Sequence, residues 1–138
     1  MSIRSEINRE IEALKELEKK AFGPRHGKTD CYRYIEGVLK LYRKWKEQKN
    51  RKTRKEQLAE LYKIKLRKNT HTIRAIIDAS SEQDATDKSR WTRALQYGEK
   101  NATEVQRVGF QKFIEGNGGI AGCARGIAER RTRMAKAA

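Results

Sequence analysis

Apolar residues recur at intervals of three and four positions through most of this chain, and this spacing restricts the elements it can form. The first stretch places Ile3, Ile7, Ile11, Leu14 and Leu17 on one stripe of a helix. Alternation with period two never persists beyond four residues, and β-branched residues are scattered. The pattern therefore predicts an all-α protein without strands.

Breaker and capping residues divide the first half into helices. Gly23 and Pro24 predict that the first helix ends near Phe22. Thr29 or Asp30 can cap the second helix, whose apolar stripe runs to Trp45. A capping box formed by Thr53 and Glu56 favours a break near residues 50–53, with a further helix over 54–79. The alternative is one rod over 30–79, about 75 Å long.

The second half begins after a polar, acidic stretch at residues 80–87 that reads as a linker. Asp87 can cap the next helix, Thr103 and Gln106 form a capping pattern for a short one, and the Gly-rich turn 116–119 precedes a last helix from Ile120. The expected organisation is a basic helical bundle or hairpin at 1–79, the linker, and a small tri-helical lobe at 88–138. Because hydrophobic residues make up only 36% of the chain, we expect thin apolar stripes and an elongated hairpin or bundle over residues 3–79.

Positive charge is concentrated in one part of the chain. Residues 28–68 hold 15 basic and 5 acidic residues, a net charge of +10 out of the chain's +15. From Arg43 to Lys55, eight of thirteen residues are basic, and their mutual repulsion at helical spacing opposes helix formation. A solvated helix face is the simple reading of such a run, but the lack of balancing glutamates favours a polyanion partner. Tyr42 and Trp45 fall on the apolar stripe, which favours core packing over base stacking.

The C-terminal part carries a second group of arginines. Residues 119–125 resemble the first helix of many helix-turn-helix motifs, in which a glycine turn precedes small residues that let two helices approach. That resemblance implies a DNA-binding lobe, although no second tight turn follows Ile127. The alternative is that the helix from Ile120 to Met134 itself reads nucleic acid through exposed arginines, or that these arginines only balance the helix dipole.

The predicted nucleic-acid contacts are the basic residues of these two regions. They are Arg43, Lys44, Lys46, Lys49, Arg51, Lys52, Arg54, Lys55, Lys63, Arg67, Lys68, Arg125, Arg130, Arg131 and Arg133.

Catalytic and metal sites are not predicted. His26 and His71 lack the close ligand spacing of a zinc site with Cys31 or Cys123, and both cysteines are expected to be free thiols. The triplet from Gly27 to Thr29 lacks the first glycine of a phosphate-binding loop. No nucleophile with an adjacent base and no carboxylate pair emerges, so we expect no enzyme, no cofactor and no metal.

The expected function is that of a small basic nucleic-acid-binding protein, DNA preferred over RNA, with an accessory or regulatory role such as those in mobile elements. One alternative is a helical adaptor or inhibitor that docks on an acidic protein surface or a larger nucleoprotein complex, with residues 3–17 pairing with a partner helix or with a second copy. Another is an RNA-binding, ribosome-associated protein. Neither a secretory segment nor a membrane span is predicted, so we expect a cytoplasmic location, nucleoid-associated or nuclear if DNA is bound.

Overall fold

The computed structural model describes residues 2–22, 28–67 and 70–127, and those residues form helices joined by turns and short irregular segments, with no strand among them. The predicted all-α fold class is confirmed. The chain divides into two compact units, residues 1–83 and 84–138, and the division falls within the stretch expected to be a linker.

Unit 1 begins with two long helices, α1 (Ile3–Ala21) and α2 (Lys28–Glu47). Ser2 caps α1, because its hydroxyl accepts a hydrogen bond from the amide of Ser5 at 3.2 Å. The helix ends at Phe22, where the sequence predicted that it would. α2 begins at Lys28, so Thr29 and Asp30 lie inside it and the predicted cap at either residue is wrong. Asp30 lies in the first turn, where its carboxylate interacts favourably with the helix dipole.

The chain does break after α2, but the helix that follows is shorter than predicted. α3 (Arg51–Tyr62) begins at Arg51, so Thr53 lies inside it and the predicted capping box at Thr53 is wrong. Lys63 takes a left-handed conformation and ends α3, and the expected continuous helix to Ala79 is therefore wrong as well. A new helix, α4 (Thr72–Ser80), starts where the ring nitrogen Nδ1 of His71 accepts a hydrogen bond from the amide of Ile73.

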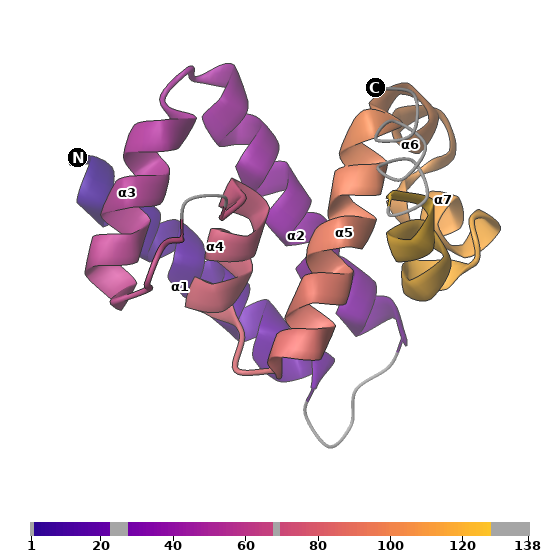
Figure 1. The fold of residues 1–138 in the computed structure, drawn as a ribbon, viewed down its shortest axis with the longest axis horizontal. Helices are drawn as coiled ribbons and strands as arrows, with labels where there is room; N and C mark the ends of the chain where they lie inside the picture. The colour runs from indigo at the N-terminus through magenta and orange to yellow at the C-terminus, as the bar shows by residue number, and fades with distance from the viewer. Residues whose placement is uncertain (1, 23–27, 68–69, 128–138) are drawn as a thin grey trace. The chain divides into compact units, whose positions relative to one another are not determined.

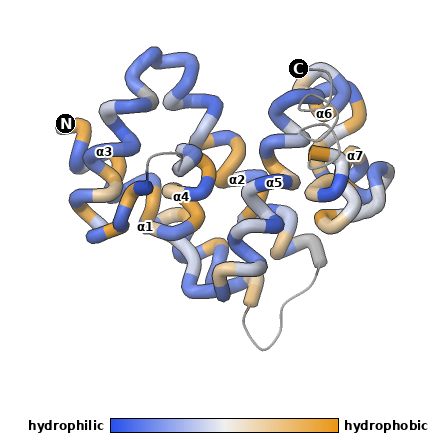
Figure 2. The backbone as a smooth tube through the Cα atoms, in the orientation of Figure 1, coloured by the Kyte–Doolittle hydropathy of each residue, from blue (hydrophilic) through white to orange (hydrophobic). Residues whose placement is uncertain are grey.

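The four helices of unit 1 all contact one another, and α4 lies among the other three (Figure 1). Ile7 and Ile11 of α1, Trp45 of α2 and Leu58 of α3 are fully buried, together with the apolar face of α4 around Ile76. Figure 2 shows hydrophobic and hydrophilic residues interspersed along these helices, with the turn between α2 and α3 hydrophilic. Burial of these stripes supplies the main stabilisation of unit 1.

This core changes the expectation that residues 3–17 pair with a partner helix or with a second copy. The middle of that stripe is Ile7, Ile11 and Leu14, which are 0%, 0% and 5% exposed within unit 1 itself. A partner helix would have to displace α2, α3 and α4 from these side chains. The stripe is therefore an internal packing surface of unit 1, and docking of a partner helix through it would require this core to open.

Two groups of polar contacts link α4 and the segment after it to α2 and α1. The Tyr34 hydroxyl lies 2.7 Å from that of Ser80, which in turn donates to the Ile76 carbonyl, so α2 is joined to the end of α4. Glu18 is 8% exposed, and its Oε1 accepts hydrogen bonds from the Ser81 hydroxyl, the backbone amide of Glu82 and the side-chain amide of Gln83. The segment after α4 is thereby fixed on α1.

Unit 2 contains α5 (Ala85–Lys100), α6 (Ala102–Val108), α7 (Phe110–Gly116) and a helical stretch over 119–127. The start of α5 is capped by Asp84, whose carboxylate accepts from the amide of Asp87 at 2.8 Å, so the predicted cap at Asp87 is wrong by three positions. Gly109 has a φ of 93° and separates α6 from α7. The expected tri-helical lobe is therefore built from one more helical segment than predicted, and α6 begins before Thr103.

Glycines allow the stretch 119–127 to pack closely in unit 2. A Cβ atom on Gly126 would lie 2.5 Å from the ring of Tyr97, and one on Gly122 would lie 2.3 Å from the carbonyl oxygen of Asn117. Those distances are far shorter than a real carbon contact. The helix thus approaches α5 and its own preceding turn at positions where no side chain fits, and its buried Cys123 lies with its sulfur 4.0 Å from the Ile114 carbonyl oxygen.

Gly122→Ala is expected to lower the free energy of unfolding of unit 2 by about 2 kcal/mol, because the new methyl group meets a backbone oxygen that cannot rotate away. Gly116→Ala is the matched control, since no atom lies within 4 Å of a Cβ at that position. Urea unfolding followed by circular dichroism measures both variants. Equal unfolding midpoints for the two would contradict the close contact at Gly122.

Candidate functional site

In unit 1, the basic residues predicted to contact nucleic acid lie at the end of α2, along α3 and just after α3. Exposed cations among them lie at the two ends of α3. We call Lys49 and Lys52, at the turn between α2 and α3, the corner cations. We call Lys63, Lys65 and Arg67, which follow α3, the tail cations. α3 has 12 residues, so the two groups are separated by about 18 Å along the helix axis.

Arg54 is the main exception to the predicted site, because its side chain points into unit 1. The guanidinium is 5% exposed and donates to Oε2 of Glu6 at 3.0 Å and to Oδ1 of Asn50 at 3.0 Å. Oε1 of Glu10 lies 3.8 Å from it. The hydrogen bond from Arg54 lowers the pKa of Glu6 below its usual value. Arg54 joins α3 to α1, so its prediction as a nucleic-acid contact is corrected.

Two more of the predicted contacts also have partners inside unit 1, and a third is half-buried. Lys44 is half exposed, and its Nζ lies 2.7 Å from Oε2 of Glu10. Lys55 donates to the Thr70 carbonyl at 3.2 Å and ties α3 to the segment before α4. Arg43 is half-buried and engaged in contacts of its own. These side chains are engaged within the protein, so they are less available to an external ligand than exposed cations without a partner.

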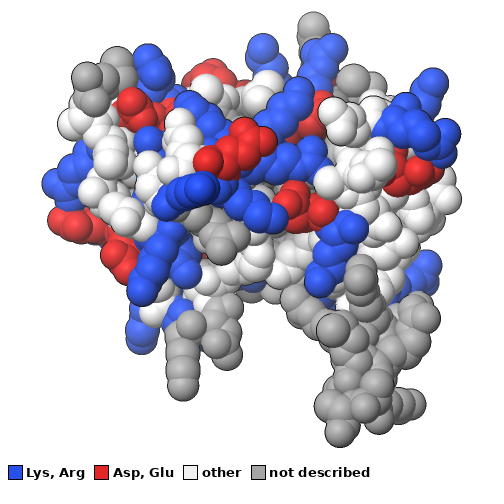
Figure 3. Space-filling model, turned by 90° about the horizontal axis from the view of Figure 1, so that it is seen from above, with Lys and Arg blue, Asp and Glu red and all other residues white. Residues whose placement is uncertain are grey.

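The corner and tail cations differ from that inner set. All five are exposed, and within the described part of the chain none of them forms an ion pair. Lys46 is exposed too, but it has a partner. Figure 3 shows the molecule from above, with Lys and Arg side chains spread over that face and acidic side chains between them. We call these five cations, Lys49, Lys52, Lys63, Lys65 and Arg67, the outer set. They are the basic side chains of this region that are exposed to a ligand and have no ion pair within the described residues.

Two of these lysines occupy backbone positions that favour glycine. Lys49 has a φ of 58° and Lys63 a φ of 53°, both in the left-handed region. For a residue with a Cβ this conformation costs about 1 kcal/mol, and helices usually end there in glycine or asparagine. The chain carries a cation at both ends of α3 in spite of that cost.

The aromatic residues Tyr42 and Trp45 are not part of this exposed basic surface. Tyr42 is 4% exposed and Trp45 is 0% exposed, which confirms the prediction that they pack in the core. The Trp45 indole nitrogen donates to Glu10 at 3.4 Å, and the Tyr42 ring lies 5.3 Å from that of His71. Stacking on bases by these two rings would require unit 1 to open.

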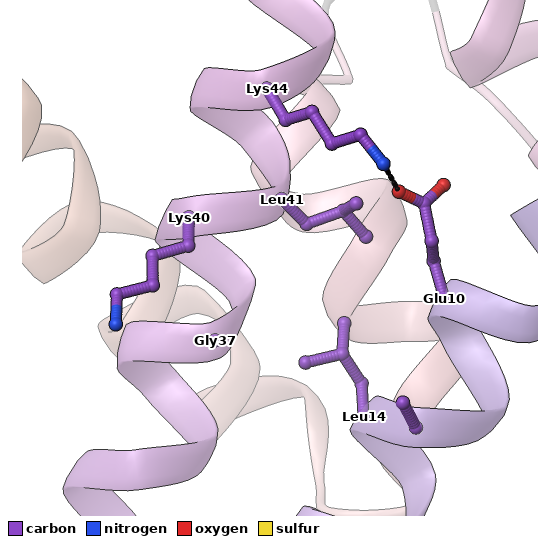
Figure 4. A pocket seen from close by; sticks show the side chains of 7 residues that line it. Glu10, Leu14, Gly37, Lys40, Leu41 and Lys44 are labelled. Atoms are coloured by element: carbon purple, nitrogen blue, oxygen red, sulfur yellow. Dashed lines mark hydrogen bonds and ion pairs between the residues drawn. The ribbon is translucent and has the colours of Figure 1, made fainter.

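A shallow groove of about 290 Å³ lies between α1 and α2, with Leu14 and Leu41 in its apolar lining. It forms where Gly37 lets the helices approach, since a Cβ there would lie 2.9 Å from a Leu14 methyl carbon. Lys44 reaches across the end of the groove to Glu10, whereas Lys40 points away (Figure 4). The charge at this groove is thus largely neutralised, and the groove is a poor site for an anion.

In unit 2, Arg125 is exposed on the stretch 119–127 and lines a hollow together with Arg90 and Arg93 of α5. Arg90 and Arg93 are not among the contacts predicted from the sequence. Their spacing of three residues was visible, but nothing in the sequence placed them opposite Arg125. Lys68, Arg130, Arg131 and Arg133 lie outside the described residues, and of Arg51 only the backbone is described.

No group of histidine, cysteine and acidic residues in the described ranges could hold a metal ion. Both cysteines are free thiols, as expected. Cys123 is fully buried between small residues, and this burial raises the pKa of its thiol to about 11. His26 lies outside the described residues.

Within the part of the chain that the structure describes, no helix is both long enough and apolar enough to span a bilayer.

This chain matches no protein-family model, no curated protein and no solved structure. Its own residues and their geometry are therefore what supports a function.

Arg54→Gln is expected to lower the free energy of unfolding by about 2 kcal/mol, because it removes a charged hydrogen bond from a buried position between α1 and α3. Lys52→Gln, an exposed neighbour on α3, should change it by no more than about 0.5 kcal/mol. Urea unfolding measures both.

The same pair of variants has a pH signature. Arg54 lowers the folded-state pKa of Glu6, so this stabilisation is complete above the unfolded pKa, about 4.3 for glutamate, and is lost as the pH falls through the lower folded pKa. The difference between the wild type and Arg54→Gln should therefore shrink in acid. A difference that stays constant down to low pH would contradict the ion pair.

Proposed function

We propose that this protein binds nucleic acid through its phosphates, duplex DNA in preference to RNA, in an accessory role and not as an enzyme. The observation that carries the proposal is the outer set of cations at both ends of α3. These side chains are exposed and have no ion pair within the described residues, while neighbouring cations of the same run are paired inside unit 1.

Charge balance supports this role. The carboxylates of Glu6 and Glu10 on α1 are engaged with Arg54 and Lys44, so they do not neutralise the outer cations. The outer lysines form no ion pair within the described residues, and two of them have a left-handed backbone conformation that costs free energy. An anionic ligand outside the molecule explains why lysine occupies these positions. A polyanion releases counterions when such side chains meet its phosphates, and this release drives binding.

The geometry favours contact with a nucleic-acid backbone. The corner and tail cations are about 18 Å apart, which corresponds to about five base-pair steps at 3.4 Å each. A stiff duplex keeps its phosphates at such separations. Because Tyr42 and Trp45 are buried and the outer set is mostly lysine, the contacts position the protein without reading bases.

The first test is the salt dependence of binding to a random-sequence DNA duplex. If all five outer cations contact phosphates, the logarithm of the affinity should fall with that of the salt concentration with a slope of about −4.5. The double variant Lys49→Gln/Lys52→Gln should reduce the magnitude of this slope by about 2. Fluorescence anisotropy at several salt concentrations measures both values.

Lys20→Gln/Lys40→Gln is the matched control, since it removes the same charge from exposed lysines outside the outer set. Its slope should stay close to that of the wild type. A slope that falls equally in both double variants would mean that only net charge matters. Tighter binding to a folded RNA in competition would overturn the preference for DNA, and no binding even in dilute buffer would overturn the proposal.

Lys63 offers a second test, because its backbone conformation and its charge have opposite effects. Lys63→Gly should raise the free energy of unfolding by up to about 1 kcal/mol by relieving the left-handed conformation, and it should weaken DNA binding by removing a cation. Lys65→Gly removes a neighbouring cation without this relief, so it should weaken binding without stabilising the protein. Urea unfolding and anisotropy on the same samples separate the two effects. Unchanged DNA affinity in Lys63→Gly would exclude Lys63 from the interface.

A further inference from the structure

Unit 2 contains a hollow of about 250 Å³ that is bordered by three arginines. Arg90 and Arg93 come from α5, where they are three residues apart, and Arg125 comes from the stretch 119–127. The rest of the lining is the small side chains of Ala121 and Ala124. Guanidinium groups from two different helices therefore share one concave surface.

The charge of this hollow is not balanced by the residues around it. Arg93 and Arg125 are exposed and form no ion pair with any residue in the described ranges. Arg90 lies 3.8 Å from a carboxylate oxygen of Asp87, one turn earlier on its own helix, and both side chains are well exposed. Cations that line one hollow repel one another, and an anion bound between them removes that repulsion.

The floor of the hollow is shaped by small residues. Gly126 packs against the ring of Tyr97, which brings the stretch 119–127 close to α5. Ala121 and Ala124 then leave space between the arginines where longer side chains would fill it. Close approach of the helices and a small-residue floor together produce a cavity, not merely a basic patch.

We propose that this hollow binds a phosphate group held by Arg90, Arg93 and Arg125. The planar guanidinium offers paired donors that match two oxygens of one phosphate, so arginine suits this anion better than lysine does. The inference deepens the proposed function and rests on it for the source of the phosphate, a nucleic-acid chain. That phosphate is either the terminal group of the chain or an internal phosphodiester.

The sharpest test changes the shape of the hollow and leaves its charge intact. Ala121 is exposed, and Ala121→Leu fills the hollow without replacing an arginine. Ala85→Leu is the matched control, because Ala85 is exposed on α5 and does not line the hollow. In the full-length chain, Ala121→Leu should weaken binding of a short single-stranded oligonucleotide by about fivefold or more, the equivalent of one lost charged contact, whereas Ala85→Leu should not.

Two oligonucleotides of one sequence, with a 5′-phosphate or a 5′-hydroxyl, distinguish the sources. If the hollow takes a terminal phosphate, the phosphorylated oligonucleotide binds the wild type more tightly, and Ala121→Leu abolishes the difference. If it takes an internal phosphate, both bind the wild type equally and Ala121→Leu weakens both. Either result supports the site.

Charge removal provides an independent variant that does not depend on how Ala121→Leu folds. Arg93→Gln should weaken binding to the same extent as Ala121→Leu, and Lys112→Gln, an exposed cation of α7 outside the hollow, should weaken it less. Wild-type affinity in both Ala121→Leu and Arg93→Gln would overturn the site. The proposed function would survive that result if Lys49→Gln/Lys52→Gln still weakened duplex binding, so the two failures are distinguishable.

Discussion

Arg54 is at the centre of the charge arrangement in unit 1. Its guanidinium lies between α3 and α1, where it donates to Glu6 and lies near Glu10, which also receives Lys44. Burying charges is costly unless they are paired, so these contacts fix which side of α3 faces α1. With the inward carboxylates engaged in this way, the corner and tail cations face solvent without acidic partners. One internal ion-pair cluster thus separates the structural cations of the basic run from those free to bind a ligand.

The features that could be predicted from the sequence are those set by neighbouring residues. The stripe of Ile7, Ile11 and Leu14 and the Gly-Pro pair after Phe22 define α1, and the structure follows them to within a residue. The same periodicity placed Tyr42 and Trp45 in the core. Helical spacing, capping residues and glycine-proline breaks act over a few residues, so a single sequence contains the information needed to interpret them.

The features that escaped prediction depend on contacts between distant residues or on a conformation that the residue type disfavours. Apolar periodicity continues past Tyr62, and a lysine is not a residue expected to end a helix, so the end of α3 at Lys63 left no signal. A count of basic residues treats Arg54 and Lys52 alike, and only the position of Glu6 on another helix tells them apart. The hollow bordered by Arg90, Arg93 and Arg125 requires the approach of two helical segments that are separated in sequence by α6 and α7, and this approach is set by Gly126 against Tyr97.

The thiol of Cys123 has a use that follows from its surroundings. It is fully enclosed within unit 2, and its raised pKa keeps it protonated at neutral pH. An alkylating reagent can reach and react with it only when the last described helix lifts away from α7, because the nucleophile is the exposed thiolate. The rate of its modification therefore measures how often unit 2 opens locally. The native chain thus contains a chemical probe of its own local fluctuations.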